Sequence, residues 1–306
     1  MSRDLNVNAE LDGSRLDKAL VTLLPGASRA KVKRAIDEGQ VRVNGRRAAK
    51  GALVKSGDVL SVASELDAAP DCTPTPDAPL DVRFETEKLV VVYKPAKTPT
   101  APLRAGEIGT LANALLGRYP SMAGVGFSAR EPGLLHRLDN DTSGLLVAAK
   151  DSDSFAALRD AMHAGHVEKH YLLLCAEAEL ADSGTISFPL ANHPKDQKRV
   201  MACIHPRDVM RNEPRPATTE YEVVRRVGAH ALVRAKASMA LRHQIRVHFA
   251  AIEHPLYGDV LYGGAPLPGL ERHALHAERL RHAHADAALS FDVSAELPAD
   301  LQAVLG

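Results

Sequence analysis

The sequence has no stretch long and apolar enough to cross a membrane. No uncharged apolar run approaches about 18 residues, the length that a membrane-spanning helix needs. Residues 1–13 are polar and contain no apolar segment of the kind found in a secretory signal. We therefore expect a cytoplasmic protein without a membrane partner.

Cysteine is also scarce. The three cysteines, Cys72, Cys175 and Cys203, lie far apart and form no Cys-x-x-Cys pair. This spacing is typical of a reducing compartment and argues against a disulfide framework or a structural zinc site. The 306 residues are enough for one large domain and one small one.

The chain as a whole has no net charge, but its charge is unevenly distributed. The formal charge is zero, yet residues 14–62 carry eleven Lys and Arg against four Asp and Glu, a net +7 that the remainder balances with −7. A basic segment on an acidic body is typical of nucleic-acid contact confined to one part of the chain. A merely solvated surface more often mixes the two signs.

The basic segment has the pattern of a small folded module. Apolar spacing predicts a helix over residues 14–24 and a second one between Ser28 and Gly39. The Asn44-Gly45 pair predicts a hairpin, and residues 59–62 a short strand. The basic side chains that we expect to contact nucleic acid are Arg29, Lys31, Lys33, Arg34 and Arg42.

The order of these elements, with the stretches RLDKAL, SRAKVKRAIDEGQVRVNG and VKSGDVL, resembles the S-four-type RNA-binding domain. The alternative is a helical cap that packs on the larger domain. Residues 65–81 are rich in Pro, Asp, Ala and Thr, which predicts a stiff linker that folds onto neither neighbour. We therefore expect an RNA-binding domain at 1–64, a linker at 65–81 and a catalytic domain at 82–306.

A polar tip between two apolar runs stands at the centre of the larger domain. Gly133–Leu135 and residues 144–149 predict two buried strands around a loop that carries His136, Arg137 and Asp139. Such a loop can hold a carboxylate and an arginine at the edge of a rigid sheet. The alternative is an ordinary hairpin with a solvated tip.

The stretch HRLDNDTSGLLV resembles the catalytic motif of the RluA family of pseudouridine synthases. The resemblance extends over about residues 80–306 and includes residues 254–263. It implies an α+β pseudouridine synthase fold with a long mixed, mainly antiparallel sheet, and it implies that Asp139 is the catalytic residue. It also implies that Tyr171, at the start of an apolar strand, is the tyrosine that packs against the target base. The alternative is a core residue whose hydroxyl reaches solvent.

The stretch SMALRHQIRVHFA resembles a second motif of the family, which implies that Arg246 is the partner of the catalytic aspartate. Its alternating Ile245, Val247 and Phe249 are typical of a strand. The histidines here lack the HExxH pattern of a metal site, so we expect no metal.

Two departures from the family pattern concern loops beside these motifs. Ala240 and Leu241 stand where Gly-Arg is usual, and Lys97 stands where glycine is usual. The first removes a basic group that could contact RNA, and the second predicts a different loop shape. The basic side chains that we expect to contact RNA in this domain are Lys94, His136, Arg137, Arg242 and His243. Residues 192–216 are also basic, and they are either a solvated loop or a second RNA-contacting surface.

The implied reaction moves the ribose bond of uridine from a ring nitrogen to a ring carbon, so it needs no cofactor. An arginine next to Asp139 would keep the carboxylate ionised, and Arg137 could fill the gap left by a displaced base. Two routes remain open, attack on the sugar carbon and removal of a ribose proton. We expect a monomeric enzyme that acts on large-subunit ribosomal RNA. The alternatives are a transfer-RNA uridine as substrate, a nucleoside hydrolase using Asp139 and Asp141, and a non-catalytic RNA-binding protein.

Overall fold

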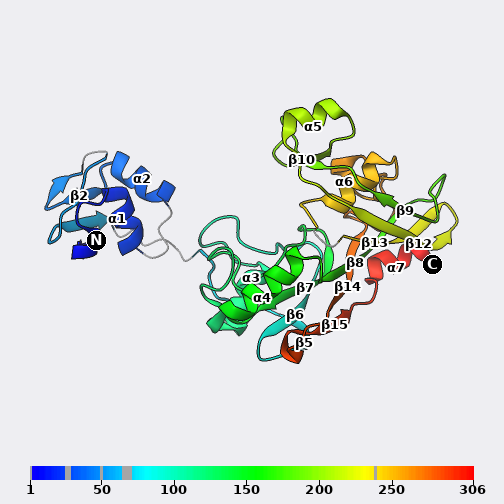
Figure 1. The fold of residues 1–306 in the computed structure, drawn as a ribbon, viewed down its shortest axis with the longest axis horizontal. Helices are drawn as coiled ribbons and strands as arrows, with labels where there is room; N and C mark the ends of the chain where they lie inside the picture. The colour runs from blue at the N-terminus through cyan, green and yellow to red at the C-terminus, as the bar shows by residue number, and fades with distance from the viewer. Residues whose placement is uncertain (1, 25–28, 49–50, 64–70, 238–239) are drawn as a thin grey trace. The chain divides into compact units, whose positions relative to one another are not determined.

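The computed structural model describes residues 2–24, 29–48, 51–63, 71–237 and 240–306 (Figure 1). The chain divides into two compact units, which we call the first unit (residues 1–73 and 103–107) and the second unit (residues 74–102 and 108–306). In the described part of the chain, none of the helices combines the length and the apolar character needed to span a bilayer.

The first unit packs two helices on a four-stranded antiparallel sheet with the order β1-β4-β2-β3. Its elements are β1 (Ser2–Asn6), α1 (Leu16–Leu23), α2 (Arg29–Asp37), β2 (Val41–Val43), β3 (Arg46–Arg47) and β4 (Val59–Ala63). Leu16, Leu20 and Val32 face an apolar core that the helices share with the sheet. Both predicted helices are confirmed, whereas β1 was not predicted; Ser28, the predicted start of the second helix, lies outside the described residues.

The turn between β2 and β3 follows directly from its two residues. Asn44 has φ +51° and Gly45 has φ +77°, the pair of positive values that a two-residue hairpin turn with the right twist requires. The side chain of Asn44 also accepts a hydrogen bond from the Val59 backbone at 2.9 Å. The predicted hairpin is confirmed.

The second unit is built on a nine-stranded sheet with the order β5-β6-β7-β14-β8-β13-β12-β9, in which β15 pairs with β14. The strands are β5 (Asp81–Glu85), β6 (Leu89–Lys94), β7 (Ser143–Ala149), β8 (Glu168–Ala176), β9 (Ser183–Ile186), β12 (Thr219–Val227), β13 (His230–Lys236), β14 (Leu275–His282) and β15 (Phe291–Ser294). Only β7 and β14 pair in parallel among these described strands. The sheet is therefore mixed and mainly antiparallel, as predicted.

The second unit also contains helices and one short hairpin outside this sheet. They are α3 (Leu111–Arg118), α4 (Ser152–His163), α5 (Pro206–Asn212), α6 (Gln244–Ala251), α7 (Ala299–Leu305) and the hairpin of β10 (Leu190–Asn192) with β11 (Val200–Ala202). Helix α3 begins with a reciprocal capping box formed by Thr110 and Asn113.

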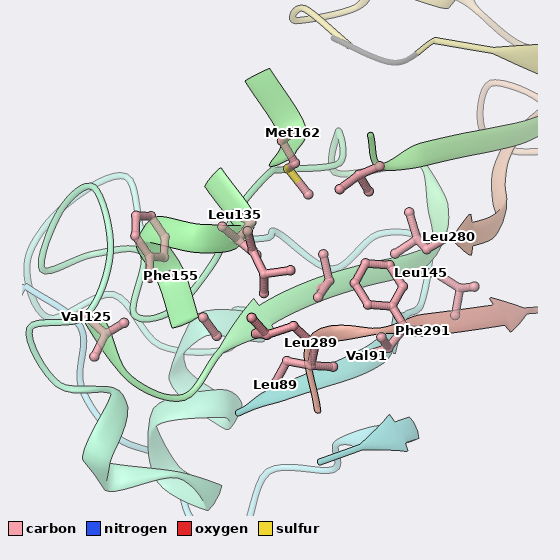
Figure 2. Close-up of a cluster of buried hydrophobic side chains, with 14 of the residues drawn as sticks. Leu89, Val91, Val125, Leu135, Leu145, Phe155, Met162, Leu280, Leu289 and Phe291 are labelled. Carbon is pink, nitrogen blue, oxygen red and sulfur yellow. The ribbon is translucent and has the colours of Figure 1, made fainter. Parts of the chain in front are cut away.

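Strand β7 runs through the core of the second unit and is buried along its whole length. Figure 2 shows Leu145 of β7 in an apolar cluster with Leu89 and Val91 of β6 and Phe291 of β15, and Phe155 of α4 belongs to the same cluster. The run is apolar on both faces because side chains cover both sides of the strand. This packing gives the loop that precedes β7 a rigid base.

The other apolar run of the central stretch is not a strand. Leu134 makes only an isolated bridge to Ala148, so the prediction of a strand over residues 133–135 is wrong. Gly133 has φ +68°, and a Cβ atom there would lie 2.3 Å from the Ala149 carbonyl oxygen. The chain lies antiparallel to the end of β7 here, and the Gly133 carbonyl accepts the Ala149 N–H at 2.8 Å, but the contact is too short to form a strand.

Helix α6 is a second correction. The alternation of Ile245, Val247 and Phe249 is typical of a strand, yet residues Gln244–Ala251 are helical. All six residues from Gln244 to Phe249 are buried, so polar and apolar side chains are both inside. The pattern does not show the helical period because no face of this part of the helix is exposed.

Part of the predicted linker is packed. The Thr75 backbone N–H donates to the Asn113 carbonyl of α3 at 3.0 Å, and Cys72 is buried. Gly117 of α3 allows this approach, since a Cβ atom there would lie 2.5 Å from the Thr75 carbonyl carbon. Proline removes donors from a segment but does not prevent it from lying on a helix.

Candidate functional site

Asp139 lies in the loop that leads into β7, and its side chain is 23% exposed. Arg246 of α6 approaches it from a distant part of the sequence. The Arg246 Nη1 donates to the Asp139 Oδ2 at 2.7 Å. The two residues that the sequence predicts as partners therefore form a charge-assisted hydrogen bond.

The guanidinium of Arg246 is itself fixed by a second carboxylate. Asp259, whose side chain is 1% exposed, accepts hydrogen bonds from Nε at 2.7 Å and from Nη2 at 2.8 Å. This bidentate geometry aligns the arginine plane and leaves Nη1 for Asp139. The ring of Tyr262 lies against the same guanidinium, with 5.2 Å from the Arg246 Cζ to the ring centroid.

His243 completes the polar surroundings of Asp139. Its Nε2 lies 3.7 Å from the Asp139 Oδ1, and its Nδ1 lies 2.8 Å from the Tyr262 hydroxyl. That hydroxyl accepts the Val200 backbone N–H at 3.0 Å, so its own proton is available to His243 Nδ1. The arrangement assigns the neutral tautomer with the proton on Nε2, which faces Asp139.

Burial and charge act in opposite directions on Asp139. Burial raises the pKa of its carboxyl, but the imidazole of His243 and the guanidinium of Arg246 lower it more, and the pKa lies below the usual value of 3.8. Burial lowers the pKa of His243 itself, so this ring is neutral at pH 7 and Arg246 provides the lasting positive charge. Asp139 is therefore an ionised carboxylate at neutral pH.

The loop that carries Asp139 is held by buried polar side chains on both sides of that residue. Each one bonds to a residue close to Asp139 along the chain: Thr100 to the Leu138 carbonyl, Lys94 to the Asn140 carbonyl, Arg272 to the Asp141 carbonyl, His273 to the Thr142 hydroxyl and His276 to the Ser143 hydroxyl. Such support holds a reactive group in one position before any substrate arrives.

Lys94 belongs to this support, which corrects its predicted place on an RNA-contacting surface. Its side chain is completely buried, and its Nζ donates to the carbonyls of Pro95, Thr98 and Asn140 at 2.8–2.9 Å. Burial lowers its pKa to about 7. All three ammonium protons are used internally, so none is left for a phosphate.

Tyr171 lies on β8, and the residue is 5% exposed. Burial raises the pKa of its hydroxyl, and the charge of Asp139 raises it further. The phenol is therefore neutral and lies within electrostatic reach of the carboxylate. Its strand register places it opposite Ala277 of β14.

The other predicted RNA contacts of the second unit differ in exposure. Arg137 is 53% exposed and its Nη1 bonds to Glu131 at 2.8 Å. His136 points inward: burial and the charge of Lys169 lower its pKa to about 3, and its Nε2 accepts the Val147 N–H at 3.3 Å. It is a partly buried ring that supports Val147, in the second half of β7.

Basic side chains of the first unit lie on its surface. Lys33, Arg34 and Arg42 are exposed, and Arg42 bonds to the Gly45 carbonyl at 3.1 Å. The side chains of Arg29 and Lys31 lie outside the described residues. The described members of the predicted set are thus open to solvent.

Sequence reasoning assigned no role to Asp259. The sequence did contain a signal for a functional role, because Asp259 is a single carboxylate among mostly apolar residues in a stretch that resembles the family. Its partner could not be predicted from the sequence, because the contact between Asp259 and Arg246 depends on how η4 (Val260–Tyr262) packs against α6. Throughout the described ranges, no group of three His, Cys, Asp or Glu side chains has a geometry suited to a metal ion.

Comparison with known proteins gives two family matches. Residues 88–251 match the family described as RNA pseudouridylate synthase, and residues 14–60 match the S4 domain. The chain is 33% identical over 303 residues to "Ribosomal large subunit pseudouridine synthase D" of Yersinia pestis, covering 94% of this chain and 89% of that protein. The Escherichia coli K12 protein of the same name is 32% identical with the same coverage.

Two solved structures are similar in fold. "Human RNA Pseudouridylate Synthase Domain Containing 1" has a TM-score of 0.55 at 24% identity and covers 71% of this chain and 83% of its own. "Human RNA Pseudouridylate Synthase Domain Containing 4" has a TM-score of 0.55 at 22% identity, with 72% and 90% covered. The predicted α+β fold is confirmed.

Proposed function

This chain belongs to the RNA pseudouridylate synthase family, and from that premise we propose that it converts specific uridines of large-subunit ribosomal RNA to pseudouridine, with Asp139 as the catalytic carboxylate. One observation supports the role of Asp139 above the others. It is an ionised, partly exposed carboxylate whose position is fixed by an arginine that a second, buried carboxylate orients.

The reaction breaks the bond between ribose C1′ and uracil N1 and forms a bond between C1′ and C5. The C5 proton leaves and N1 gains a proton, so no atom or electron is supplied from outside. Asp139 can act by attack on C1′ or by removal of a ribose proton, and both routes need the ionised form. Arg246 keeps the carboxylate in this form and in one orientation.

Tyr171 and Arg137 are proposed to contact the target nucleotide. The neutral phenol of Tyr171 lies near Asp139, where its ring would restrain the detached uracil between cleavage and reattachment. A base that leaves its stack costs a few kcal/mol, and the exposed guanidinium of Arg137 is available to fill the gap. His243 is proposed to contribute its Nε2 proton to the same pocket.

The proposed substrate rests on two supports. The curated relatives named above are large-subunit enzymes by name, and the first unit presents exposed basic side chains of the kind that contact phosphates. We propose the division into an RNA-binding domain (1–64), a linker (65–81) and a catalytic domain (82–306). A monomer suffices, because Asp139, Arg246, Asp259 and Tyr171 all come from one chain, and we propose the cytoplasm as its location.

The experiment is carbodiimide mapping of pseudouridine on unmodified ribosomal RNA and transfer RNA, without added metal or nucleotide. Wild-type protein is expected to produce new stops on the large-subunit RNA. Asp139→Asn should lower the rate by more than about 1,000-fold while RNA binding persists. Asp141→Asn is the matched control and should keep the rate within a few-fold.

Other outcomes would contradict the proposal in distinct ways. Stops on transfer RNA alone would change the substrate but not the reaction. Binding without stops would favour a non-catalytic RNA-binding protein, and free uracil in the supernatant would indicate hydrolysis.

A further inference from the structure

Arg199, at the end of the β10–β11 turn, is a basic side chain without an anionic partner. Across the described residues no carboxylate pairs with it, and its Nε is buried without a hydrogen bond. This Nε has lost water contacts without gaining a protein acceptor, although the side chain as a whole is partly exposed. An unpaired donor of this kind calls for an explanation in a ligand that the free protein does not contain.

The position of Arg199 connects it to the site around Asp139. Its Cζ lies 5.7 Å from the ring centroid of Tyr262, within the range of a cation–π contact. Tyr262 is the residue that bonds His243 and contacts Arg246. Only one aromatic side chain therefore separates Arg199 from the groups that surround the carboxylate.

The backbone around Arg199 is held firmly. Its N–H donates to the Asp196 carbonyl at 3.0 Å, and its carbonyl accepts a hydrogen bond from the Arg242 Nη2 at 3.0 Å. The next residue, Val200, donates to the Tyr262 hydroxyl. Arg242 also bonds the Gln197 carbonyl at 3.0 Å, so it fastens the turn to the start of α6.

The contrast with Arg246 indicates what Arg199 binds. Arg246 contacts the same tyrosine but is neutralised by Asp139 and Asp259. Arg199 keeps its full charge, is partly exposed, and stands beside exposed Lys195 and Lys198 on the same turn. A planar guanidinium with free donors matches a phosphate group in geometry and charge.

We propose that Arg199 binds a backbone phosphate next to the target uridine, so that the β10–β11 turn contacts the RNA at one side of the site. This proposal rests on the proposed function and names a substrate contact of that same site. It chooses between the two interpretations of residues 192–216 that the sequence left open. A displaced nucleotide brings its flanking phosphates toward the protein, and a fixed cation there lowers the cost of displacement.

The test compares Arg199→Gln, Arg199→Lys and Arg159→Gln in the full chain. Arg159 is an exposed arginine of α4 that bonds to its neighbour Asp160, so its variant removes the same charge elsewhere. Binding of an RNA hairpin with the mapped uridine is measured at several salt concentrations. Arg199→Gln should raise Kd about tenfold, as for the loss of a hydrogen bond to a charged group.

The salt dependence and a modified RNA make the assignment specific. Arg199→Gln should reduce the slope of log K against log salt by about 0.7–0.9, the value for one phosphate contact, while Arg199→Lys keeps the wild-type slope. A methylphosphonate at one position flanking the uridine should weaken binding of the wild type but not of Arg199→Gln. Thermal unfolding of the three variants, equal to that of the wild type, shows that the fold is retained.

Three results would overturn the proposal. A slope and Kd for Arg199→Gln equal to those of Arg159→Gln, with an active wild type, would refute the phosphate site alone. A lower rate with unchanged Kd would make Arg199 a support of Tyr262. Wild-type protein that forms no pseudouridine would refute the proposed function and the inference together.

Discussion

The two units of this protein place charge in opposite ways. Among the described residues of the first unit, none of the buried side chains is polar or charged, whereas seventeen polar or charged side chains are buried in the described part of the second unit. The first unit holds its charge in water around an apolar core. The second places Lys94, Arg246 and Asp259 inside, where each needs a specific partner.

This difference corresponds to two tasks. Contact with a phosphate backbone is long-range and needs only exposed positive charge on a stable support. A reactive carboxylate needs a defined position and ionisation state, and buried partners provide both. The fold of the first unit therefore depends on apolar packing, and the function of the second on buried polar pairs.

The largest effect is expected from a cavity in the core of the first unit. Leu20 is fully buried there, and Leu20→Ala should cost about 2–5 kcal/mol, enough to unfold so small a unit. RNA affinity should fall while the second unit keeps its thermal transition in the full chain. Leu53→Ala, at a 64% exposed position, should change stability by less than about 0.5 kcal/mol. A shift of both transitions with Leu20→Ala would show that the core of the first unit also stabilises the second.

The second effect compares one buried and one exposed ion pair. Asp259→Asn removes a bidentate partner of Arg246 and should cost about 1.5–3 kcal/mol and lower the rate about 100-fold by misplacing the arginine. Asp292→Asn is the matched control, because Asp292 also holds an arginine, Arg279, at 2.7 Å with both oxygens but is 50% exposed. Its cost should be about 0–1 kcal/mol. Equal urea midpoints for the two variants would show that the buried pair contributes no more to stability than the exposed pair.

The contribution of Lys94 to stability should depend on pH, unlike that of an exposed lysine. Its pKa of about 7 in the folded protein lies below the usual 10.5, so the unfolded chain binds more protons between these values. Stability of the wild type therefore rises with pH in this window, by up to about 1.4 kcal/mol per pH unit. Lys94→Met lacks this contribution.

Urea unfolding at pH 7, 8 and 9 measures the effect of Lys94. The free energy of unfolding of the wild type, minus that of Lys94→Met, should increase as the pH rises. Lys88→Met, at a side chain that is 38% exposed, should show a constant difference. A constant difference for Lys94→Met would show that its ammonium is not destabilised by burial.

The smallest effect concerns the loop where glycine was expected. Lys97 has φ +62°, so it adopts the left-handed conformation that glycine favours, and its ion pair with Glu271 is well exposed. Lys97→Gly should stabilise the protein by about 0.5–1 kcal/mol. Lys97→Ala keeps the Cβ atom and should not. A lower melting temperature for Lys97→Gly would show that the pair with Glu271 outweighs the strain.

Local sequence accounts well for the elements with one exposed face or a specific turn. The helices of the first unit, the Asn44-Gly45 turn and the Thr110 cap of α3 follow from short-range rules. Helix α6 and the short run at Gly133 do not. The first is buried all round and the second is set by close contact with β7, so their periodicity carries no usable signal.

The sequence by itself determined the family and the basic character of the first unit, because motifs and charge are local properties that the chain displays directly. The pairing of Asp139 with Arg246 followed from the family resemblance of the two motifs. The tertiary structure alone decided that Asp259 orients this pair, that Lys94 is internal and that Arg199 lies beside Tyr262. These are contacts between residues far apart in the chain. The packing of α6, η4 and the β10–β11 hairpin brings Arg246, Asp259, Tyr262 and Arg199 together, and the pairing of β6 with β7 brings Lys94 near the loop of Asp139.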